Sequence, residues 1–240
     1  MRDLLANVKF MVMLRLKSLN SGVSLKTKHV QRLIEILQRF ETHNPSPHCE
    51  LYYQTPYQLL ISVVLSAQTT DKMVNRCMEP LYKKGFFPQT VLDLGEQGFY
   101  QHIKSIGLAK TKAGYVYRLT KILLEKSDGE VPCSREFLES LPGVGRKTAS
   151  VVLGELFREP TLAIDTHVFR VSQRLGLHKE KTVQAAERSL LKIIPTHYLP
   201  RAHHWMVLHG RYLCKALRPL CNDCFLKDIC PSVDIKKEKK

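Results

Sequence analysis

Residues 138–149 read LESLPGVGRKTA. Pro142 is expected to stop one helix, and Gly143 and Gly145 then permit backbone angles that other residues avoid. The stretch therefore predicts a helix, a glycine turn and a second helix. The free N–H groups of the turn and of the second helix's first residues would face outward, where the helix dipole attracts an anion. An ordinary turn between two helices is the alternative.

Arg146 and Lys147 open the second helix. A DNA phosphate is the natural occupant of such a site, because backbone contacts to phosphate position a protein without reading sequence. Lys147 would then hold a phosphate. Its other interpretation is a nucleophile: the helix dipole and partial burial beside Arg146 would lower the pKa of the amine, and a neutral amine can form a Schiff base with a sugar carbon.

Asp165 is the acid that such a lysine needs. Residues 163–170 read AIDTHVFR, so Asp165 precedes a predicted amphipathic helix and is a good N-cap. Its carboxylate could also accept the proton of the lysine or stabilise a positively charged sugar in the transition state. The two roles are compatible, because a capping side chain has a fixed rotamer.

Four cysteines near the C-terminus follow the spacing C-x6-C-x2-C-x5-C, at Cys214, Cys221, Cys224 and Cys230. A compact cysteine set of this kind is more typical of metal binding than of disulfides. Sulfur-only ligation suits zinc or an iron–sulfur cluster. Structural zinc sites usually bring two close cysteine pairs, whereas only one pair is close here, and the wider spread favours a [4Fe–4S] cluster. Two disulfides and scattered core cysteines are the alternatives. The other three cysteines are expected to be core or surface thiols: Cys49, Cys77 and Cys133.

Length and charge limit the partners. The chain has 240 residues, enough for one large core or two modest ones, and a formal net charge of +15. Such a basic balance favours polyanionic partners, which are nucleic acid or an anionic membrane surface. No apolar run approaches the ~20 residues that a spanning helix needs, so we expect no membrane partner.

Residues 1–27 are expected to be a disordered basic leader, and residues 236–240 a basic tail. The apolar patch at 10–14 is too short for the core of a signal peptide. A transit peptide has the same basic, acid-poor composition, so organellar import stays open beside a cytoplasmic location. Met11 and Met13 leave open a start further downstream.

Apolar periodicity and turn residues predict helix after helix. Thr55 and Pro56 supply an N-cap and a first-turn proline ahead of the apolar run 59–65, so a buried helix is favoured there over a buried strand. No alternating stretch argues for a sheet, and the predicted class is all-α. Residues 106–113 resemble residues 142–149, which indicates local reuse of a turn. Further helices are expected over 28–41, 71–83, 90–95, 97–105, 110–126, 134–140, 146–157, 166–175, 182–194 and 200–216.

Taken together, these residues resemble the endonuclease III family, the iron–sulfur DNA glycosylase/lyases of the helix-hairpin-helix superfamily. The resemblance extends from about Lys28 to Asp234. Five features carry it: the hairpin 141–147 with its lysine, the IDTH stretch 164–167, the LSAQTTD stretch 65–71, the histidine-rich segment 203–212 and the cysteine spacing.

The resemblance implies two helical lobes with a DNA-binding cleft between them. Residues 49–159 would form a six-helix domain that contains the hairpin. Residues 28–48 and 160–235 would form the second domain, with a [4Fe–4S] cluster on the four cysteines. Such a protein would act as a monomer in base excision repair, on double-stranded DNA that contains oxidised pyrimidines or abasic sites.

Residue roles follow from the same resemblance. Lys147 would attack C1′ of a flipped, damaged pyrimidine nucleotide with help from Asp165, and the imine would then eliminate the 3′ phosphate. Gly143, Gly145 and Arg146 would contact DNA. Gln68 would fill the vacated space and Leu108 would wedge the opposite strand. A surface amide that ends a helix and a core residue of a turn are the respective alternatives for Gln68 and Leu108.

Two other functions share part of the pattern. A mismatch adenine glycosylase of the same superfamily has the hairpin, the aspartate and the cluster, but it lacks the nucleophilic lysine and carries a further C-terminal domain. A non-catalytic iron–sulfur DNA-binding module would use Lys147 only for phosphate, and the joint presence of Asp165 argues against it. The histidines are expected to be structural or phosphate-contacting, since the cysteines already provide four ligands: His203, His204 and His209.

Overall fold

The computed structural model describes residues 25–233. Over this range the chain is helical and contains no β-strand, which confirms the all-α prediction. None of the helices in that range has the length and apolar character needed to cross a bilayer. In chain order the helices are α2 (Leu25–His43), α3 (Pro56–Leu65), α4 (Asp71–Lys83), α5 (Pro88–Ile103), α6 (Ala109–Ser127), α7 (Arg135–Ser140), α8 (Arg146–Phe157), α9 (Thr166–Arg174), α10 (Val183–Ile193) and α11 (Leu199–Tyr212), with short 3-10 turns η1 (Thr196–Tyr198) and η2 (Cys221–Asp223).

Side-chain caps set the starts of the helices. The Thr55 hydroxyl accepts a hydrogen bond from the Gln58 N–H at 3.2 Å, and Pro56 follows at the first helical position. α3 is buried on nearly every face, because a helix satisfies its own backbone groups and can therefore cross a core. The helix prediction for residues 59–65 is confirmed. Four further helices begin at side-chain caps of the same kind: Thr70, Ser134, Asp165 and Thr182.

Three boundaries differ from the prediction. The helices expected over 90–95 and 97–105 form one helix, α5, kinked at Gly95, where φ is 64° and only glycine is unstrained. The helix expected over 200–216 ends at Tyr212, because the N–H groups of the next two residues both bond to the His209 carbonyl, at 3.0 and 2.7 Å. α2 begins at Leu25, so residues 25–27 of the predicted leader are helical. The rest of the leader and the basic tail lie outside the described residues.

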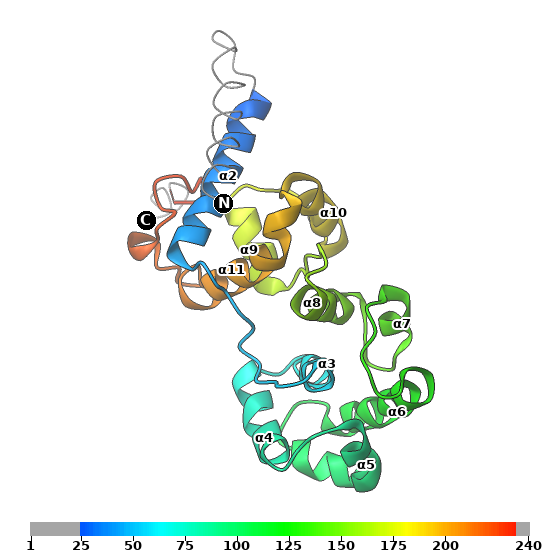
Figure 1. The fold of residues 1–240 in the computed structure, drawn as a ribbon. Coiled ribbons are helices and arrows are strands. Elements are labelled where there is room, and N and C mark those ends of the chain that lie inside the picture. Colours follow the sequence, from blue (N-terminus) through cyan, green and yellow to red (C-terminus); the bar gives the residue numbers. More distant parts are fainter. Residues whose placement is uncertain (1–24, 234–240) are drawn as a thin grey trace.

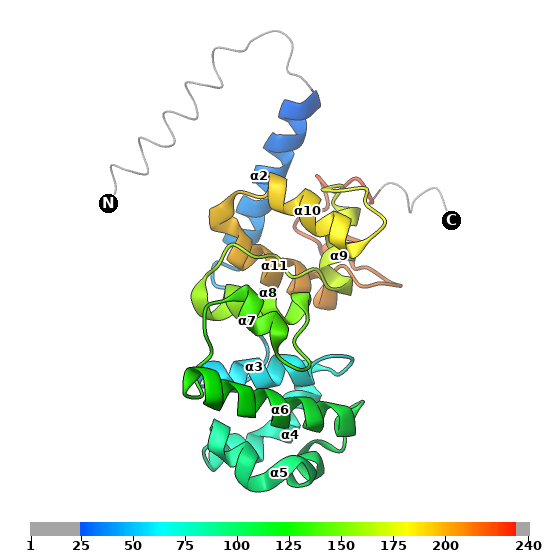
Figure 2. The same cartoon turned by 90° about the vertical axis from the view of Figure 1, so that its right-hand side faces the viewer.

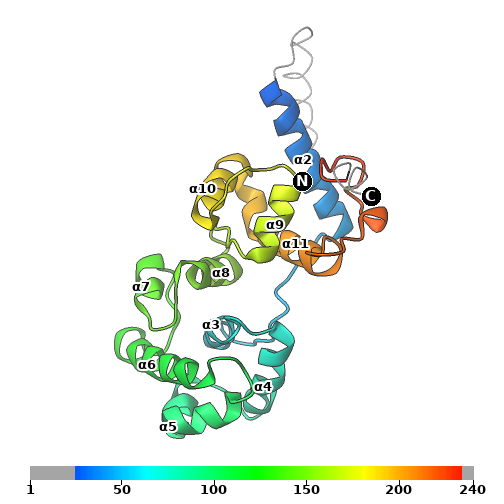
Figure 3. The same cartoon turned by 180° about the vertical axis from the view of Figure 1, so that it is seen from behind.

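The buried apolar side chains form two cores. The first lies among α3–α8 and runs in sequence from Leu51 to Leu153. The second joins Leu33–Phe40 of α2 to residues between Leu162 and Leu226, around Trp205, whose exposed fraction is 2%. We call the helices α3–α8 lobe A, and α2 with α9–α11 lobe B. Figure 1 shows lobe B above lobe A, and Figure 3 shows the same division from behind.

Helix α8 lies at the boundary between the lobes, below α11 and beside α7, as the turned view in Figure 2 shows. Its core face belongs to lobe A, but both of its ends are tied to lobe B. At the start of α8, Arg146 pairs with Glu187 of α10 at 2.9 Å. Near its end, Glu155 bonds to His204 of α11 at 2.8 Å. The helix that opens with Lys147 is therefore fixed from both sides of the boundary.

Candidate active site between the lobes

A cavity of about 230 Å³ lies between the lobes and brings three of the predicted site residues together. Gln68 and Lys147 come from lobe A, and Asp165 comes from the start of α9 in lobe B. These residues are separated by up to almost 100 positions in sequence, and only the packing of the two lobes unites them. The lining also includes His203 and Arg211 of α11.

Lys147 stands in the first turn of α8 and is exposed. The predicted partial burial beside Arg146 is therefore wrong. The physical reason is that the Arg146 guanidinium points away and makes a two-pronged contact with Glu187, at 2.9 and 3.0 Å. Glu187 is 7% exposed and its pairing raises the pKa of Arg146. Arg146 thus anchors the helix, while Lys147 remains open to a ligand.

The hairpin turn needs one of its glycines for conformation. Gly143 has φ +80°, and a Cβ at this position would lie 2.8 Å from the Tyr115 ring. Gly145 is different: its φ is −94°, which any residue adopts, and a Cβ there would meet nothing within 4 Å. The prediction that both glycines hold special backbone angles is wrong for Gly145. Gly145 is the N-cap of α8. Because glycine has no side chain to accept a hydrogen bond, the first N–H groups of the helix have no side-chain partner.

Asp165 is the N-cap of α9. Its Oδ1 accepts a hydrogen bond from the Val168 N–H at 2.7 Å, which confirms the capping prediction. One carboxylate oxygen is thereby used for structure, and the other is available to the cavity that the side chain lines. A carboxylate held in this way is a suitable acceptor for a proton from the Lys147 amine.

His203 lines the same cavity, and its ring is held by a hydrogen bond between Nδ1 and the Ala163 carbonyl at 2.8 Å. Because the carbonyl can only accept, Nδ1 carries the proton and Nε2 is the free acceptor. Burial, together with the charges of His204 and Lys147, lowers the pKa of His203 to about 4 against the opposing effect of Asp165. His203 is therefore a neutral imidazole beside Lys147 and Asp165. The structural role predicted for it agrees with this contact.

His204 lines the same cavity, and its Nε2 lies 2.8 Å from a carboxylate oxygen of Glu155 of α8. Glu155 also accepts a hydrogen bond from the Tyr53 hydroxyl at 2.7 Å. Burial alone would raise the pKa of Glu155, but the hydrogen bonds from His204 and Tyr53 outweigh it and hold the pKa at about 2. The carboxylate is thus charged at neutral pH and joins three segments behind the cavity.

The two residues predicted to enter DNA lie on neighbouring turns of lobe A. Gln68 is exposed with φ 55°, and Leu108 is 59% exposed with φ 60°. The alternative of a core residue is wrong for Leu108. A bulky residue in the left-handed region is uncommon and strained, and such strain gathers at functional sites. The backbone of both Gln68 and Leu108 therefore has a conformation that is uncommon for residues other than glycine.

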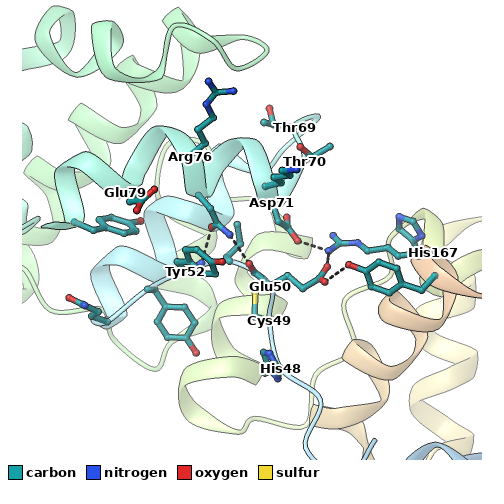
Figure 4. A pocket seen from close by; sticks show the side chains of 18 of the residues that line it. His48, Cys49, Glu50, Tyr52, Thr69, Thr70, Asp71, Arg76, Glu79 and His167 are labelled. Carbon is teal, nitrogen blue, oxygen red and sulfur yellow. Dashed lines mark hydrogen bonds and ion pairs between the residues drawn. The ribbon is translucent and has the colours of Figure 1, made fainter. Parts of the chain in front are cut away.

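A larger cavity of about 1440 Å³ adjoins the first and shares Glu50, Asp71 and Arg211 with it. Arg211 of α11 bonds to Asp71 of α4 at 2.7 Å and to Glu50 of the segment between the lobes. In Figure 4, dashed lines from Glu50 and Asp71 mark these two contacts, and His167 lies nearby. Burial alone would raise the pKa of Glu50, but hydrogen bonds from Tyr212 and Arg211 lower it. This ion network joins the lobes at the rim of the candidate active site.

The four C-terminal cysteines line one small cavity of about 30 Å³ beside apolar side chains of the same loop, and none forms a disulfide. Burial raises the pKa of Cys224 and Cys230, and the nearby cysteine thiols raise it further. Ionisation of Cys224 and Cys230 is thus opposed by their surroundings, which fits a bound metal group that would supply positive charge. Within residues 25–233, no three His, Cys, Asp or Glu side chains already hold the geometry of a single-ion site.

Two arginines of α9 fasten this cysteine loop. Arg174 donates to the Lys215 and Ala216 carbonyls, at 2.8 Å each, and lies 3.4 Å from the Cys214 sulfur. Arg170 donates to the carbonyls of Gly210 and Cys214, at 2.8 and 3.1 Å. The loop is thus positioned by protein contacts before any metal group is considered.

Sequence reasoning missed the residues that act through other residues: Tyr53, Lys112, Glu155, Arg170, Arg174, Glu187 and Arg211. Most of their partners stand more than 40 positions away in sequence, so no local spacing identifies them. Arg170 and Arg174 could have been noticed from their own spacing, since a four-residue interval places both on one face of α9.

The fold and site match a known class of proteins. Residues 61–196 match the family model of the HhH-GPD superfamily base excision DNA repair proteins. The chain is 49% identical to endonuclease III of Haemophilus influenzae and 47% identical to that of Escherichia coli strain K12, in each case over 197 residues that cover 82% of this chain and 93% of the relative. It therefore belongs to the endonuclease III family of that superfamily.

Solved structures agree with this assignment. The fold superposes on a trapped endonuclease III–DNA covalent intermediate with a TM-score of 0.80, and on a non-covalent endonuclease III–DNA complex with a TM-score of 0.81. Both are 42% identical in sequence, and each match covers 88% of this chain and 99% of the other. A thermostable thymine-DNA glycosylase shares the fold at 20% identity, with a TM-score of 0.75.

Proposed function

We propose that this member of the endonuclease III family is a bifunctional DNA glycosylase/AP lyase of base excision repair that uses Lys147 as its nucleophile. The observation that supports this most is the meeting of an exposed lysine, a fixed aspartate and Gln68 at one cavity between the lobes. The family membership supports the reaction class. The net charge of +15 supports duplex DNA as the partner.

The reaction can be written with Lys147, Asp165, the substrate and water alone. Asp165 accepts a proton from the Lys147 ammonium, and the neutral amine attacks C1′ of the damaged nucleotide as the bond to the base breaks. Asp165 passes the proton it holds to the departing base. The new C1′ ammonium gives one proton to the ring oxygen O4′ as the C1′–O4′ bond breaks, which opens the sugar and leaves a protonated imine. Abstraction of a proton from C2′ then expels the 3′ phosphate by β-elimination, and water releases the enzyme. Once it has given its proton to the base, the Asp165 carboxylate is negatively charged again and stabilises the cationic adduct between the sugar and Lys147.

In this proposal, the DNA binds at the cavity between the two lobes. The damaged nucleotide must leave the helix to reach a buried cavity. We propose that Gln68 and Leu108 fill and wedge the space it leaves, and that the free N–H groups at Gly143, Gly145 and the start of α8 hold a phosphate. The side chains of Gln68 and Leu108 are both exposed, which supports their insertion. For Arg146, the pairing with Glu187 favours anchoring α8 over direct DNA contact.

The domain limits are part of the proposal. Residues 49–159 would form one domain and residues 28–48 with 160–235 the other, and the separate cores of lobes A and B support this division. The bacterial relatives support action in the cytoplasm, at the nucleoid.

A [4Fe–4S] cluster is the metal group proposed for the four cysteines: Cys214, Cys221, Cys224 and Cys230. When bound, it would cross-link the end of α11 to the loop that follows and hold basic residues of that loop toward DNA. Lys147, and not the cluster, carries the reaction. Purified protein should contain about four iron and four sulfide per chain by this assignment, and Cys224→Ser should lower both together. One zinc per chain would contradict it.

Borohydride trapping tests the proposed nucleophile. Reduction of the imine should join the protein covalently to a duplex that contains thymine glycol, and Lys147→Gln should abolish the joined species. Lys126→Gln is the matched control, because Lys126 is an exposed lysine near the far end of α6. Trapping that persists in Lys147→Gln would reject the assignment, and Lys147 would then be a phosphate ligand.

A further inference from the structure

Lys112 is buried without a role in the proposed chemistry. It lies near the start of α6, its exposed fraction is 3%, and burial lowers the pKa of its amine. Its Nζ donates to the Leu65 carbonyl at 2.8 Å and to the Thr69 hydroxyl at 2.9 Å. Both acceptors are neutral. Burial of an amine against neutral partners is costly, so stability alone does not explain this lysine.

The acceptors of Lys112 bracket the turn that carries Gln68. Leu65 is the last residue of α3, and the chain then turns through residues 66–69, which we call the Gln68 turn. Within it, the Thr69 N–H bonds to the Ser66 carbonyl at 3.0 Å. Gln68 sits in the left-handed region at φ 55°, a conformation that needs support from its surroundings. The Lys112 amine holds both ends of this turn.

The backbone of Lys112 holds the other tip. Its N–H donates to the Leu108 carbonyl at 2.9 Å, which is the bond that starts α6. Leu108 protrudes with φ 60°, while its neighbours Ile106 and Ala109 are buried, with exposed fractions of 5% and 7%. We call residues 106–108 the Leu108 turn. The two turns touch, since a Cβ on Gly107 would lie 3.5 Å from the Gln68 carbonyl oxygen.

We infer that Lys112 is a positioning residue that couples the Gln68 turn to the Leu108 turn, so that the two tips enter the duplex as one rigid element. This inference rests on the proposed insertion of Gln68 and Leu108. One residue thereby links the two turns, through its amine on one side and its backbone N–H on the other. A rigid pair does not have to be ordered when the base leaves the stack, and that lowers the cost of extrusion.

The test separates duplex chemistry from chemistry that needs no insertion. Lys112→Met removes the amine and keeps an unbranched, apolar side chain of similar length. We expect single-turnover base release from a thymine-glycol duplex to fall by about 10-fold or more, because small misplacements of a positioning element have effects of that size. Cleavage of a single-stranded oligonucleotide with an abasic site should change less than about twofold, since no opposite strand is wedged there. Lys121→Met, an exposed lysine on the same helix, should change neither rate.

Coupling is measured by a double-mutant cycle. Gln68→Ala should slow duplex base release in the parent protein, but should slow it little further in Lys112→Met. 2-Aminopurine placed opposite the lesion should become bright on binding of the parent protein and stay dim with Lys112→Met. Thr69→Val removes one acceptor and keeps Lys112, and it should give the same pattern in weaker form if Lys112→Met does not fold.

Three outcomes would overturn the inference: full duplex activity in both Lys112→Met and Thr69→Val, equal loss on duplex and single-stranded substrates, or simply multiplicative effects of Lys112→Met and Gln68→Ala. Each of these leaves the proposed function intact as long as Gln68→Ala and Leu108→Ala impair duplex base release. If those two alanine variants release base from the duplex at the parent rate, the insertion part of the proposed function fails instead.

Discussion

At the scale of single residues, Asp165 shows how structure and chemistry share one side chain. One oxygen caps α9 through the Val168 N–H at 2.7 Å, and the side chain lines the cavity that holds Lys147. The cap restricts the carboxylate to one rotamer, so its position near the lysine needs no further ordering when substrate arrives. A residue with only the first role would tolerate any good capping side chain.

Replacement of Asp165 by asparagine separates the two roles. Asn caps helices about as well as Asp, so the free energy of unfolding should change little. Base release should slow by about 100-fold or more, because the amide cannot accept the proton or stabilise the sugar cation. Single-turnover kinetics and duplex affinity, measured on the same lesion, check this. A loss of affinity and stability with an unchanged chemical rate would leave Asp165 as a structural cap only.

At the scale of structural elements, the two glycines of the hairpin before α8 differ: one position requires glycine for its backbone conformation, and the other does not. Gly143 needs its positive φ and has the Tyr115 ring against it, whereas Gly145 has ordinary angles and open space. The sequence motif treats the two glycines alike. Only their backbone angles and neighbours distinguish the position that keeps the turn folded from the position that keeps it accessible.

Alanine at each glycine tests this distinction. Gly143→Ala should lower the free energy of unfolding by about 1–3 kcal/mol, since it adds strain at positive φ and a contact with Tyr115. Gly145→Ala should change it by less than about 0.5 kcal/mol, as expected for an open surface site. Urea denaturation of both variants gives the comparison. Equal destabilisation would contradict the different roles assigned to the two positions.

Helix α11 carries a pH-sensitive histidine. Burial, followed by the charge of His204, lowers the pKa of His203 from 6.5 to about 4. The unfolded chain therefore binds more protons than the folded chain between those two pH values, and stability falls as pH drops through that window. His203→Gln should reduce the fall in unfolding free energy between pH 7 and pH 5, measured by urea denaturation. His102→Gln, at an exposed histidine, should leave the pH dependence as it is; the same slope in all three proteins would contradict burial of a neutral His203.

Most of the helix positions could be predicted from the sequence. Thr55, Thr70 and Asp165 are capping residues whose local chemistry defines a helix start, and all three stand where helices begin. The kink at Gly95 could not be predicted as such, because a glycine in a helical pattern is equally compatible with a break between two helices. The exposure of Lys147 also could not be predicted, since it depends on Glu187, forty residues away, which draws Arg146 aside.

At the scale of the whole molecule, the candidate site depends on how the lobes meet. Glu155 with His204, Arg146 with Glu187, and Arg211 with Asp71 all connect helices of different lobes. These pairs hold the lobes together around the cavity, so the distance between Lys147 and Asp165 depends on contacts made by other residues. Sequence patterns could supply the candidate residues but not these contacts, which join positions far apart in the chain.

The net charge gives a prediction at the same scale. With 37 basic and 22 acidic side chains, the protein should neutralise several DNA phosphates and release their counterions. The logarithm of its affinity for an undamaged duplex should fall linearly with the logarithm of the salt concentration, with a slope of about −0.9 for each phosphate neutralised. Fluorescence anisotropy across a salt series provides the slope. An affinity that does not change with salt would contradict a basic DNA-binding surface.

In the proposed reaction, Lys147 forms the covalent bond to the sugar. The most direct measurement is mass spectrometry of the borohydride-reduced complex after digestion, which locates the sugar adduct on a single peptide. We predict the adduct on Lys147, in the first turn of α8. An adduct on another lysine or on the N-terminal amine, with Lys147 unmodified, would show that Lys147 is not the nucleophile.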